Sequence, residues 1–431
     1  MKEASKNYTG FRKSKSALFV FFMTSKQYFI IILILGFLST ISPFSIDMYL
    51  PGFPAIARDL NATIAQIQLS LTSYLIGIAA GQLLYGPLLD RFGRKIPLYA
   101  GLTLYILASL GCALTDSVET LIFMRFIQAI GGCAGMVAAM ALVRDLFPVT
   151  ETAKVFSLLT LVIAVSPMIA PTVGGYVTST LGWHYVFLIL AGITALIIVG
   201  IYLALPAGRK ADPSISLRPG PVLSNFFQVI KHPQFLIYTL AGGVGAAAPF
   251  AYIAGSPDIF MNIYKVSEQE YGWIFAFLAS AMIGSTQVNT LLLRRFTSEQ
   301  LIKIALTGQT IIGVVLLAGV IGGWYGKYSL ILIIFLFLCG QGLNVPNASA
   351  LTLAPFARLA GSASALMGCF RMGIGALASA AVSLLHNGTA VPMVGVMVFC
   401  AVSGLSILLL GPKIMDLNTQ LTDREEITVT S

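Results

Sequence analysis

The chain has 431 residues, of which 57% are hydrophobic and only 10% are charged, and its formal net charge is +9. A soluble globular protein carries about 25% charged residues, so this composition excludes a water-soluble fold and points to lipid as the main solvent. On a soluble protein the positive charge would suggest nucleic acid. Here most of the basic residues lie in loops on one side of the predicted membrane helices, so we expect no nucleic-acid partner. The five cysteines lie in apolar runs without paired spacing, so we expect no disulfide, metal site or cofactor.

Long uncharged runs recur along the whole chain, and a helix needs about 20 apolar residues to span a bilayer. Two runs, 155–208 and 372–412, are long enough for two crossings each, with turns near TSTLGWH and LLHNGTAVP. Together with eight single runs they predict an all-α membrane protein of twelve transmembrane helices. The single runs are 27–46, 60–89, 96–115, 126–143, 234–257, 271–293, 304–326 and 328–357.

The basic residues are distributed unequally between the two sides of such a membrane. With both termini on one side, that side holds 21 of the 26 Lys and Arg residues, and only Arg58, Lys265 and Lys327 lie on the other. Cytoplasmic loops carry the excess of basic residues, so we expect a multi-pass protein of the inner membrane with both termini in the cytoplasm. The first apolar run is full length and lacks a small-residue cleavage site, which favours a first helix over a signal peptide.

Residues 206–233 interrupt the apolar pattern with proline, glycine and basic residues. We interpret them as a cytoplasmic linker between two six-helix halves, in which VLSNFFQVIKH forms an amphipathic helix on the lipid surface. The predicted organisation is a tail (1–26), a first half (27–205), the linker, a second half (234–411) and a tail (412–431). Pro43, Phe44 and Pro51 recur 206 residues later, and LLDRF at 88–92 recurs as LLRRF at 292–296, which favours duplicated, pseudo-symmetric halves.

The first predicted helix ends in the sequence SPFSIDMYLPGFPAI, which places Asp47 near the outer end of an uncharged span. An acid in a span is costly and is a functional hypothesis by default, so we predict that Asp47 exchanges a proton. The alternative is a permanently ionised carboxylate at the helix mouth that caps backbone groups. Phe44 and Tyr49 are predicted to supply aromatic walls to a substrate cavity, although packing within the protein is the alternative.

Residues 86–95, GPLLDRFGRK, place one acid and three bases between two apolar runs. Gly86 and Gly93 permit tight turns and close backbone approach, and the Asp90 carboxylate suits the positive end of a neighbouring helix. We predict a cytoplasmic gate, with a simple positively charged loop as the alternative. The gate residues are Gly86, Asp90, Arg91, Gly93, Arg94 and Lys95, joined by Arg144 and Asp145 from the end of the fourth predicted helix.

The fourth predicted helix carries Arg125 inside apolar sequence, with Gln128 one turn later on the same face. We predict that Arg125 faces the cavity and pairs with Asp47 or with a negative group of the substrate. A structural arginine bonded to carbonyl oxygens is the alternative.

The fifth predicted helix contains SPMIAPTVGGYV, in which small residues four apart let another helix approach closely and prolines bend the axis. The residues concerned are Ser166, Pro167, Ala170, Pro171, Gly174 and Gly175.

In the second half, polar residues again interrupt apolar runs. Gln341 and Asn344 lie three apart on one face of the tenth predicted helix, and Arg371 lies inside the eleventh. We predict that they line the cavity with Phe250 and Tyr252, and that Asp258 is a candidate partner for Arg371. Structural packing is the alternative.

These stretches together resemble the Bcr/CflA group of the major facilitator superfamily, and the likeness covers essentially the whole chain. The loop 86–95 marks the superfamily, whereas DMYLP at 47–51 and the RxxQAxGG pattern at 125–132 are more specific. Residues 166–175 resemble the antiporter motif gxxxGPxxGG, with Ser166 and Ala170 in place of two glycines. Some multidrug relatives carry a second acid about two turns before the first-helix aspartate, where this chain has Ser39.

The resemblance implies a monomeric drug–proton antiporter in which Asp90 docks at the start of the eleventh helix, near Gly361. It also makes the fifth helix a seal between the halves. We therefore expect a proton-coupled exporter of small, largely apolar compounds, chloramphenicol- or bicyclomycin-like, that works by alternating access. A dedicated exporter of amino acids or nucleobases is the main alternative, and a nutrient symporter is a weaker one. We do not expect an enzyme, because none of His184, His232 and His386 lies in an HExxH motif and no GxSxG elbow occurs.

Overall fold

The computed structural model describes residues 24–206, 208–213, 219–356 and 359–430, and its ordered elements in these ranges are all helical. Twelve helices are long and apolar enough to cross a membrane, which confirms the predicted number. The predicted N-terminal tail lies largely outside the described residues, as does part of the linker, and the boundaries of tails and linker stay predictions.

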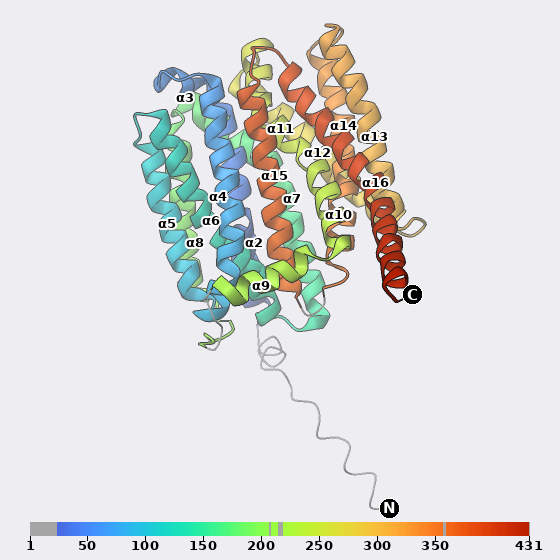
Figure 1. Ribbon diagram of the computed structural model, residues 1–431. Helices are drawn as coiled ribbons and strands as arrows, with labels where there is room; N and C mark the ends of the chain where they lie inside the picture. Colours follow the sequence, from blue (N-terminus) through green and yellow to red (C-terminus); the bar gives the residue numbers. More distant parts are fainter. Residues whose placement is uncertain (1–23, 207, 214–218, 357–358, 431) are drawn as a thin grey trace, which may run out of the picture.

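The first six crossings run from α2 to α8. Their elements are α2 (Ser25–Asp47), η1 (Leu50–Gly52), α3 (Phe53–Asp59), α4 (Ile64–Arg91), α5 (Lys95–Ala113), α6 (Val118–Leu146), α7 (Val149–Thr180) and α8 (His184–Ala204). The helix α9 (Pro219–Ile230) follows and lies across one end of the bundle (Figure 1). We call this end the α9 end; α3 lies at the opposite end.

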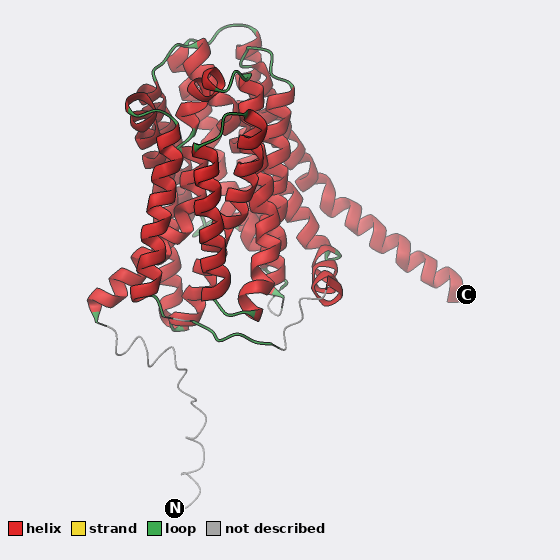
Figure 2. Cartoon of the chain, turned by 90° about the vertical axis from the view of Figure 1, so that its left-hand side faces the viewer, coloured by secondary structure: helices red, strands yellow, loops and turns green. Residues whose placement is uncertain are grey.

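The second six crossings run from α10 to α16. Their elements are α10 (Pro233–Gly245), α11 (Ala248–Pro257), the π-helical turn η2 (Asp258–Ile263), α12 (Glu268–Leu292), α13 (Ser298–Ile321), α14 (Lys327–Leu353), α15 (Ala360–Leu384) and α16 (Val391–Thr430). The helices run roughly along one direction, side by side (Figure 2).

The first crossing is longer than the sequence pattern predicts. The run 27–46 predicts that the helix ends beside Asp47, but the crossing continues through η1 and α3 to Asp59. Prolines permit this continuation, because Pro51 and Pro54 lie at the start of η1 and α3, where a missing N–H costs nothing. Asp47 therefore lies inside a crossing, one residue before its break, and not at its mouth.

The two halves contact each other mainly through two helix pairs, α4 with α15 and α7 with α12. Four hydrogen bonds join the halves directly, and all four lie toward the opposite end: Thr72 to Ser379 (2.8 Å), Ser383 to the Ala65 carbonyl (2.6 Å), Thr172 to the Gly272 carbonyl (3.3 Å) and Gln269 to Ser179 (2.8 Å). Among the described residues, the hydrogen bonds between the halves therefore hold them together away from α9.

Glycines of α7 permit two close backbone contacts, one inside the first half and one across the interface. A Cβ on Gly174 would lie 1.9 Å from the Met48 carbonyl oxygen, and one on Gly175 would lie 2.4 Å from that of Glu268. Backbone atoms cannot move aside as a flexible side chain can. Helix α7 is therefore held between the break in the first crossing and the start of α12.

We expect Gly174→Ala to destabilise the protein by about 1–3 kcal/mol or more, because the added methyl overpacks a backbone contact. The matched control is Gly192→Ala in α8, where a Cβ meets no atom within 4 Å. That change should leave the midpoint of thermal unfolding of the detergent-purified protein unchanged or slightly raised. Equal midpoints for the two variants would contradict the packing described here.

Candidate functional site

Asp47 is the last residue of α2, and its side chain is only 4% exposed. Within the described part of the chain it makes no hydrogen bond or ion pair. The phenols of Tyr252 in α11 and Tyr271 in α12, both from the other half, lie within electrostatic range of its carboxyl. The next residue, Met48, touches Gly174. Asp47 is thus a buried acid at the meeting point of α2, α7 and the second half.

Arg125 is fully buried in α6 and does not pair with Asp47. Its Nη1 donates to Gln128 Oε1 (2.6 Å) and its Nη2 to the Ser45 carbonyl oxygen (2.9 Å). Gln128 in turn donates to Ser109 (2.7 Å). The structural alternative, an arginine bonded to a carbonyl oxygen, therefore describes this structure better than the predicted pair.

Three aromatic rings surround the Arg125 guanidinium. The rings of Tyr74, Tyr49 and Phe187 have centroids 4.1, 4.5 and 5.7 Å from its Cζ atom. Cation–π attraction of this kind gains strength when the cation is desolvated. Tyr49 also bonds to Ser70 and is 1% exposed, so it packs inside the first half and is not a free wall of a substrate cavity.

The other predicted aromatic walls occupy different places. Phe44 lies with Phe37, Tyr105 and Leu190 in a pocket between α2, α5 and α8, on a side of α2 where Phe37 is exposed. Phe250 covers Gly375 of α15, where a Cβ would lie 2.6 Å from its ring. Tyr252, from the second half, lies within electrostatic range of Asp47.

Gln341 and Asn344 are fully buried in α14, and both amides donate hydrogen bonds to backbone carbonyls near the break between α10 and α11. Pro249 has no N–H, so it cannot bond to the carbonyl four residues earlier, that of Gly245. Gln341 Nε2 donates to this oxygen at 2.8 Å, and Asn344 Nδ2 donates to the Gly242 oxygen at 3.3 Å. Gln341 therefore replaces a backbone hydrogen bond that the broken helix loses. Asn344 adds a second donor to the Gly242 oxygen, which also accepts from the Ala246 N–H (2.8 Å). In this structure both amides bind backbone, and their place in the cavity lining stays a prediction.

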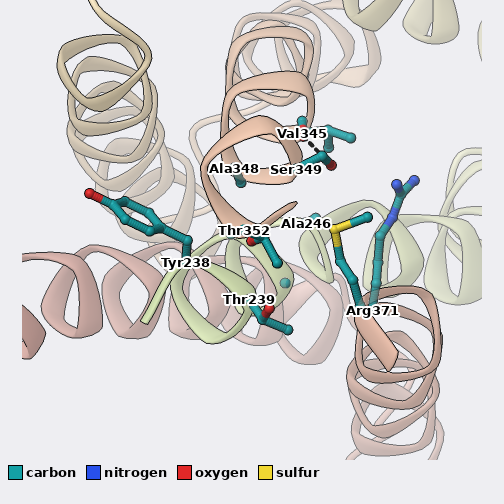
Figure 3. A pocket seen from close by; sticks show the side chains of 11 residues that line it. Tyr238, Thr239, Ala246, Val345, Ala348, Ser349, Thr352 and Arg371 are labelled. Atoms are coloured by element: carbon teal, nitrogen blue, oxygen red, sulfur yellow. Dashed lines mark hydrogen bonds between the residues drawn. The ribbon is translucent and has the colours of Figure 1, made fainter. Parts of the chain in front are cut away.

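Arg371 lies midway along α15, beside a cavity between α10, α14 and α15 (Figure 3). Its candidate partner Asp258 is elsewhere: Asp258 binds His386 Nε2 (2.9 Å) and accepts a bond from Asn262 (2.8 Å) at the opposite end. The expected pair fails because Arg371 lies 15 residues, about four helical turns, before His386, the residue that Asp258 binds. Within the described residues, Arg371 itself makes no ion pair.

At the α9 end, the loop 86–95 closes on Asp145. Arg94 binds Asp145 through Nε (2.7 Å) and Asp90 through Nη1 (2.7 Å), and its side chain is 7% exposed. Burial lowers the pKa of Arg94, but the hydrogen bonds to Asp145 and Asp90 outweigh this and raise it above its usual value. Gly93 has φ +79°, the left-handed region that favours glycine. These four residues form a compact charged turn.

The remaining gate residues are placed differently from one another. Arg91 donates to the Pro213 carbonyl and Lys95 to that of Ile201 (3.5 Å), so both anchor the turn to neighbouring backbone. Arg144 is exposed and carries no hydrogen bond or ion pair within the described residues, so its predicted place in the cluster is corrected. A Cβ on Gly86 would meet nothing within 4 Å, so this glycine makes no close backbone approach.

The expected contact between Asp90 and the start of α15 is not formed in the described part of the chain. Asp90 is half-exposed, binds Arg94 and accepts a bond to its own carbonyl from Asp212 (3.3 Å). Gly361, near the start of α15, has open space around it. The direct hydrogen bonds between the halves thus lie toward the opposite end, while this predicted latch is open.

The antiporter-like motif of α7, residues 166–175, contributes small buried residues close to Asp47. Ser166 and Ala170 are 2% and 0% exposed, and Pro167 and Pro171 lie inside the helix without ending it. The Pro171 carbonyl lies 2.9 Å from a Cβ placed on Gly272 of α12. The backbones of α7 and α12 therefore lie in direct contact, as Gly174 and Gly175 also require.

Sequence reasoning missed three partners of the site. Tyr271 bonds to Ser256 (2.9 Å) close to Asp47, and His386 binds Asp258. The first pair is separated by 15 residues and the second by 128, and no spacing in the sequence predicts either. The sequence signal that could have indicated them is the presence of Tyr and His residues near the ends of predicted membrane helices.

Comparison with known proteins identifies the class to which this architecture belongs. The family model described as Major Facilitator Superfamily matches residues 35–380. The chain is 34% identical to the uncharacterized MFS-type transporter YdgK of Bacillus subtilis, over 88% of this chain and 95% of that protein. It is 32% identical to a bicyclomycin resistance protein homolog of Haemophilus influenzae (88% and 94%) and 31% identical to a chloramphenicol resistance protein of Pseudomonas aeruginosa (86% and 87%).

Solved structures show the same fold at low sequence identity. A D-xylose-proton symporter has a TM-score of 0.70 at 15% identity, covering 89% of this chain and 97% of that one. The nucleoside transporter NupG also has a TM-score of 0.70, at 14% identity, covering 89% and 98%. The fold and its relatives thus define a multi-pass inner-membrane transporter of small molecules, not an enzyme. The chain belongs to the major facilitator superfamily.

We expect Arg94→Gln to destabilise the protein by about 3–5 kcal/mol, because it leaves Asp145, 14% exposed, without its cation. Arg144→Gln, one residue from Asp145 but exposed, should change stability by no more than about 0.5 kcal/mol. Thermal unfolding in detergent measures both. If Arg144→Gln destabilised as much as Arg94→Gln, the assignment of partners would be wrong.

Proposed function

We propose that this protein is a proton-coupled antiporter that exports small, largely apolar compounds, with both termini in the cytoplasm. In this proposal the α9 end faces the cytoplasm, as the excess of Lys and Arg on that side favours. The names of two relatives, a bicyclomycin resistance protein homolog and a chloramphenicol resistance protein, support drug-like substrates.

The observation that carries the proposal is the setting of Asp47. Its carboxyl is buried and has no cationic partner among the described residues, because the nearby Arg125 is occupied by Gln128 and the Ser45 carbonyl. A buried charge without a partner is costly, and a bound proton removes that cost. Asp47 can therefore hold a proton when buried and give it up when water or a substrate reaches it.

The contacts around Asp47 connect its protonation to movement of the halves. The break at Met48 lies against Gly174 of α7, and the phenols of Tyr252 and Tyr271 of the other half lie within electrostatic range of the acid. Separation of the halves at this end would expose the acid to the outside, and closure would bury it again. Antiport then requires that proton and substrate bind antagonistically, which is a reciprocal coupling free energy.

The open latch at the α9 end fits one state of such a cycle. The halves are joined on the proposed outer side, while Asp90 binds Arg94 and not the start of α15. We propose that Asp90 caps α15 in the state that is open to the outside. A carboxylate at a helix N-terminus is stabilised by the partial positive charge there.

Transport in inverted vesicles tests the role of Asp47. When a proton gradient is imposed, added chloramphenicol should dissipate part of it for the wild type and not for Asp47→Asn, which cannot exchange a proton. The control, Asp116→Asn, removes an exposed acid from the loop before α6 and should behave as the wild type. A substrate-dependent response of undiminished size in Asp47→Asn would remove this residue from the mechanism.

The latch makes a separate prediction. Asp90→Asn should leave thermal unfolding nearly unchanged, because a half-exposed ion pair contributes about 0–1 kcal/mol. It should nevertheless lower export of chloramphenicol at least about tenfold if the lost interaction is worth 1.4 kcal/mol or more in the transport cycle. Normal export by folded Asp90→Asn protein would show that the loop has no gating role.

A further inference from the structure

A narrow pocket lies between α10, α14 and α15, in the half of these helices nearer the α9 end. Small residues create the space, since Gly242, Gly243, Ala246 and Ala348 all contribute to its lining. Arg371 reaches this space from α15, and Figure 3 shows its side chain extending beside the cavity without a hydrogen bond to the residues drawn.

Arg371 has no partner within the described residues, and its Nε atom is buried without an acceptor. The carboxylates of the second half between 234 and 411 are all placed elsewhere. Asp258 binds His386, Glu299 accepts from the Tyr238 hydroxyl while exposed, and Glu268 and Glu270 lie in the first turn of α12 at the opposite end. Arg371 therefore has no carboxylate partner, unlike Arg94, and no hydrogen bond, unlike Arg125, whose partners are neutral.

Two further polar atoms of the same cavity are unpaired. The hydroxyls of Thr239 in α10 and Thr352 in α14 are buried and form no hydrogen bond, although Thr and Ser in helices commonly bond to a carbonyl of the preceding turn. Both residues line the cavity with Arg371. Buried polar groups are almost always hydrogen-bonded, so three unpaired groups around one space point to a ligand.

The chemistry of these groups selects the ligand. A guanidinium donates two parallel hydrogen bonds to a planar pair of oxygens and accepts none, and each hydroxyl can add one donor. The rest of the lining, including Val345 and Met367, is apolar. A cationic group would meet the uncompensated charge of Arg371 and would be repelled.

We propose that this cavity is the substrate subsite that binds a planar two-oxygen acceptor, a carboxylate or a nitro group, at one end of a small apolar compound. This inference rests on the proposed export function for its biological meaning, but it concerns binding alone. It predicts that the transporter prefers such compounds over cations of the same shape.

Binding to the detergent-purified protein tests the preference with two matched pairs of probes. The first pair is chloramphenicol and its analogue with the nitro group reduced to an amine; the second is 4-phenylbutyrate and 4-phenylbutylamine. Isothermal titration should give Kd values about 10- to 100-fold lower for the nitro and carboxylate members, as expected for hydrogen bonds to charged groups. Equal or tighter binding of the amines would overturn the proposal.

Variants identify the residue responsible. Arg371→Gln should weaken binding of chloramphenicol and 4-phenylbutyrate by about 10- to 100-fold and leave that of the two amines unchanged or improved. Arg371→Lys, which keeps the charge but loses the planar fork, should fall between. Thr352→Val should give a smaller loss for the same two probes, and Arg144→Gln should give none. An equal loss for all four probes would show that Arg371 has a structural role only.

Asp47→Asn separates this inference from the proposed function. The variant should retain the preference for nitro and carboxylate probes even though coupled transport is lost. If vesicles show no proton coupling while this preference persists, the antiport proposal fails and the subsite stands. If coupling is present but the probe pairs bind equally, the subsite fails and antiport stands.

Discussion

The structure depends on two close backbone contacts of α7, one inside the first half beside a buried acid and one across to the second half. Gly174 brings α7 against the carbonyl of Met48, and Gly175 brings it against Glu268 at the start of α12. No larger residue fits at either position without moving a backbone. Asp47, the residue before Met48, is thereby held where α2, α7 and the second half meet, so any change in its charge acts on the interface that a carrier must open and close.

The first crossing of each half is a broken helix, and at the break before Pro249 a polar side chain compensates the lost backbone bond. In the first crossing, α2 ends at Asp47 and the chain continues through η1, while in the seventh, α10 ends at Gly245 and α11 begins before Pro249. Gln341 supplies the hydrogen bond that Pro249 cannot make. Lipid offers no replacement for a lost backbone hydrogen bond. A polar residue that the sequence suggests as cavity lining is therefore needed to stabilise the broken helix.

Three intramembrane or membrane-edge arginines illustrate how environment decides role. Arg94 has two carboxylates, Arg125 has a carbonyl, an amide and three aromatic rings, and Arg371 has no partner within the described residues. The first two hold elements of the first half together, although the Nε atom of Arg125 is buried without an acceptor. The third retains its hydrogen-bonding capacity, and the unpaired threonines beside it have theirs, which makes this side of the second half chemically distinct from the side around Asp47.

Much of the fold could be predicted from the sequence because hydrocarbon imposes long apolar helices. The twelve crossings, the turns near 181 and 388, and the family followed from run length and short motifs. The end of the first crossing could not be predicted. Pro51, Gly52 and Pro54 are typical of a helix end, but here they lie in short helical segments that continue the crossing. The partners of Arg125 and Gln341 are backbone carbonyls, which every residue carries and no sequence pattern marks. The approach of Tyr271 to Asp47 is set by the docking of the halves.

Proton release on substrate binding is the most direct test of the central claim that Asp47 exchanges its proton for substrate. Purified protein in weakly buffered detergent solution, with a pH-sensitive dye, should release protons when chloramphenicol is added, and Asp47→Asn should release none. Release of equal size from the wild type and Asp47→Asn, or binding by the wild type without any release, would contradict the account.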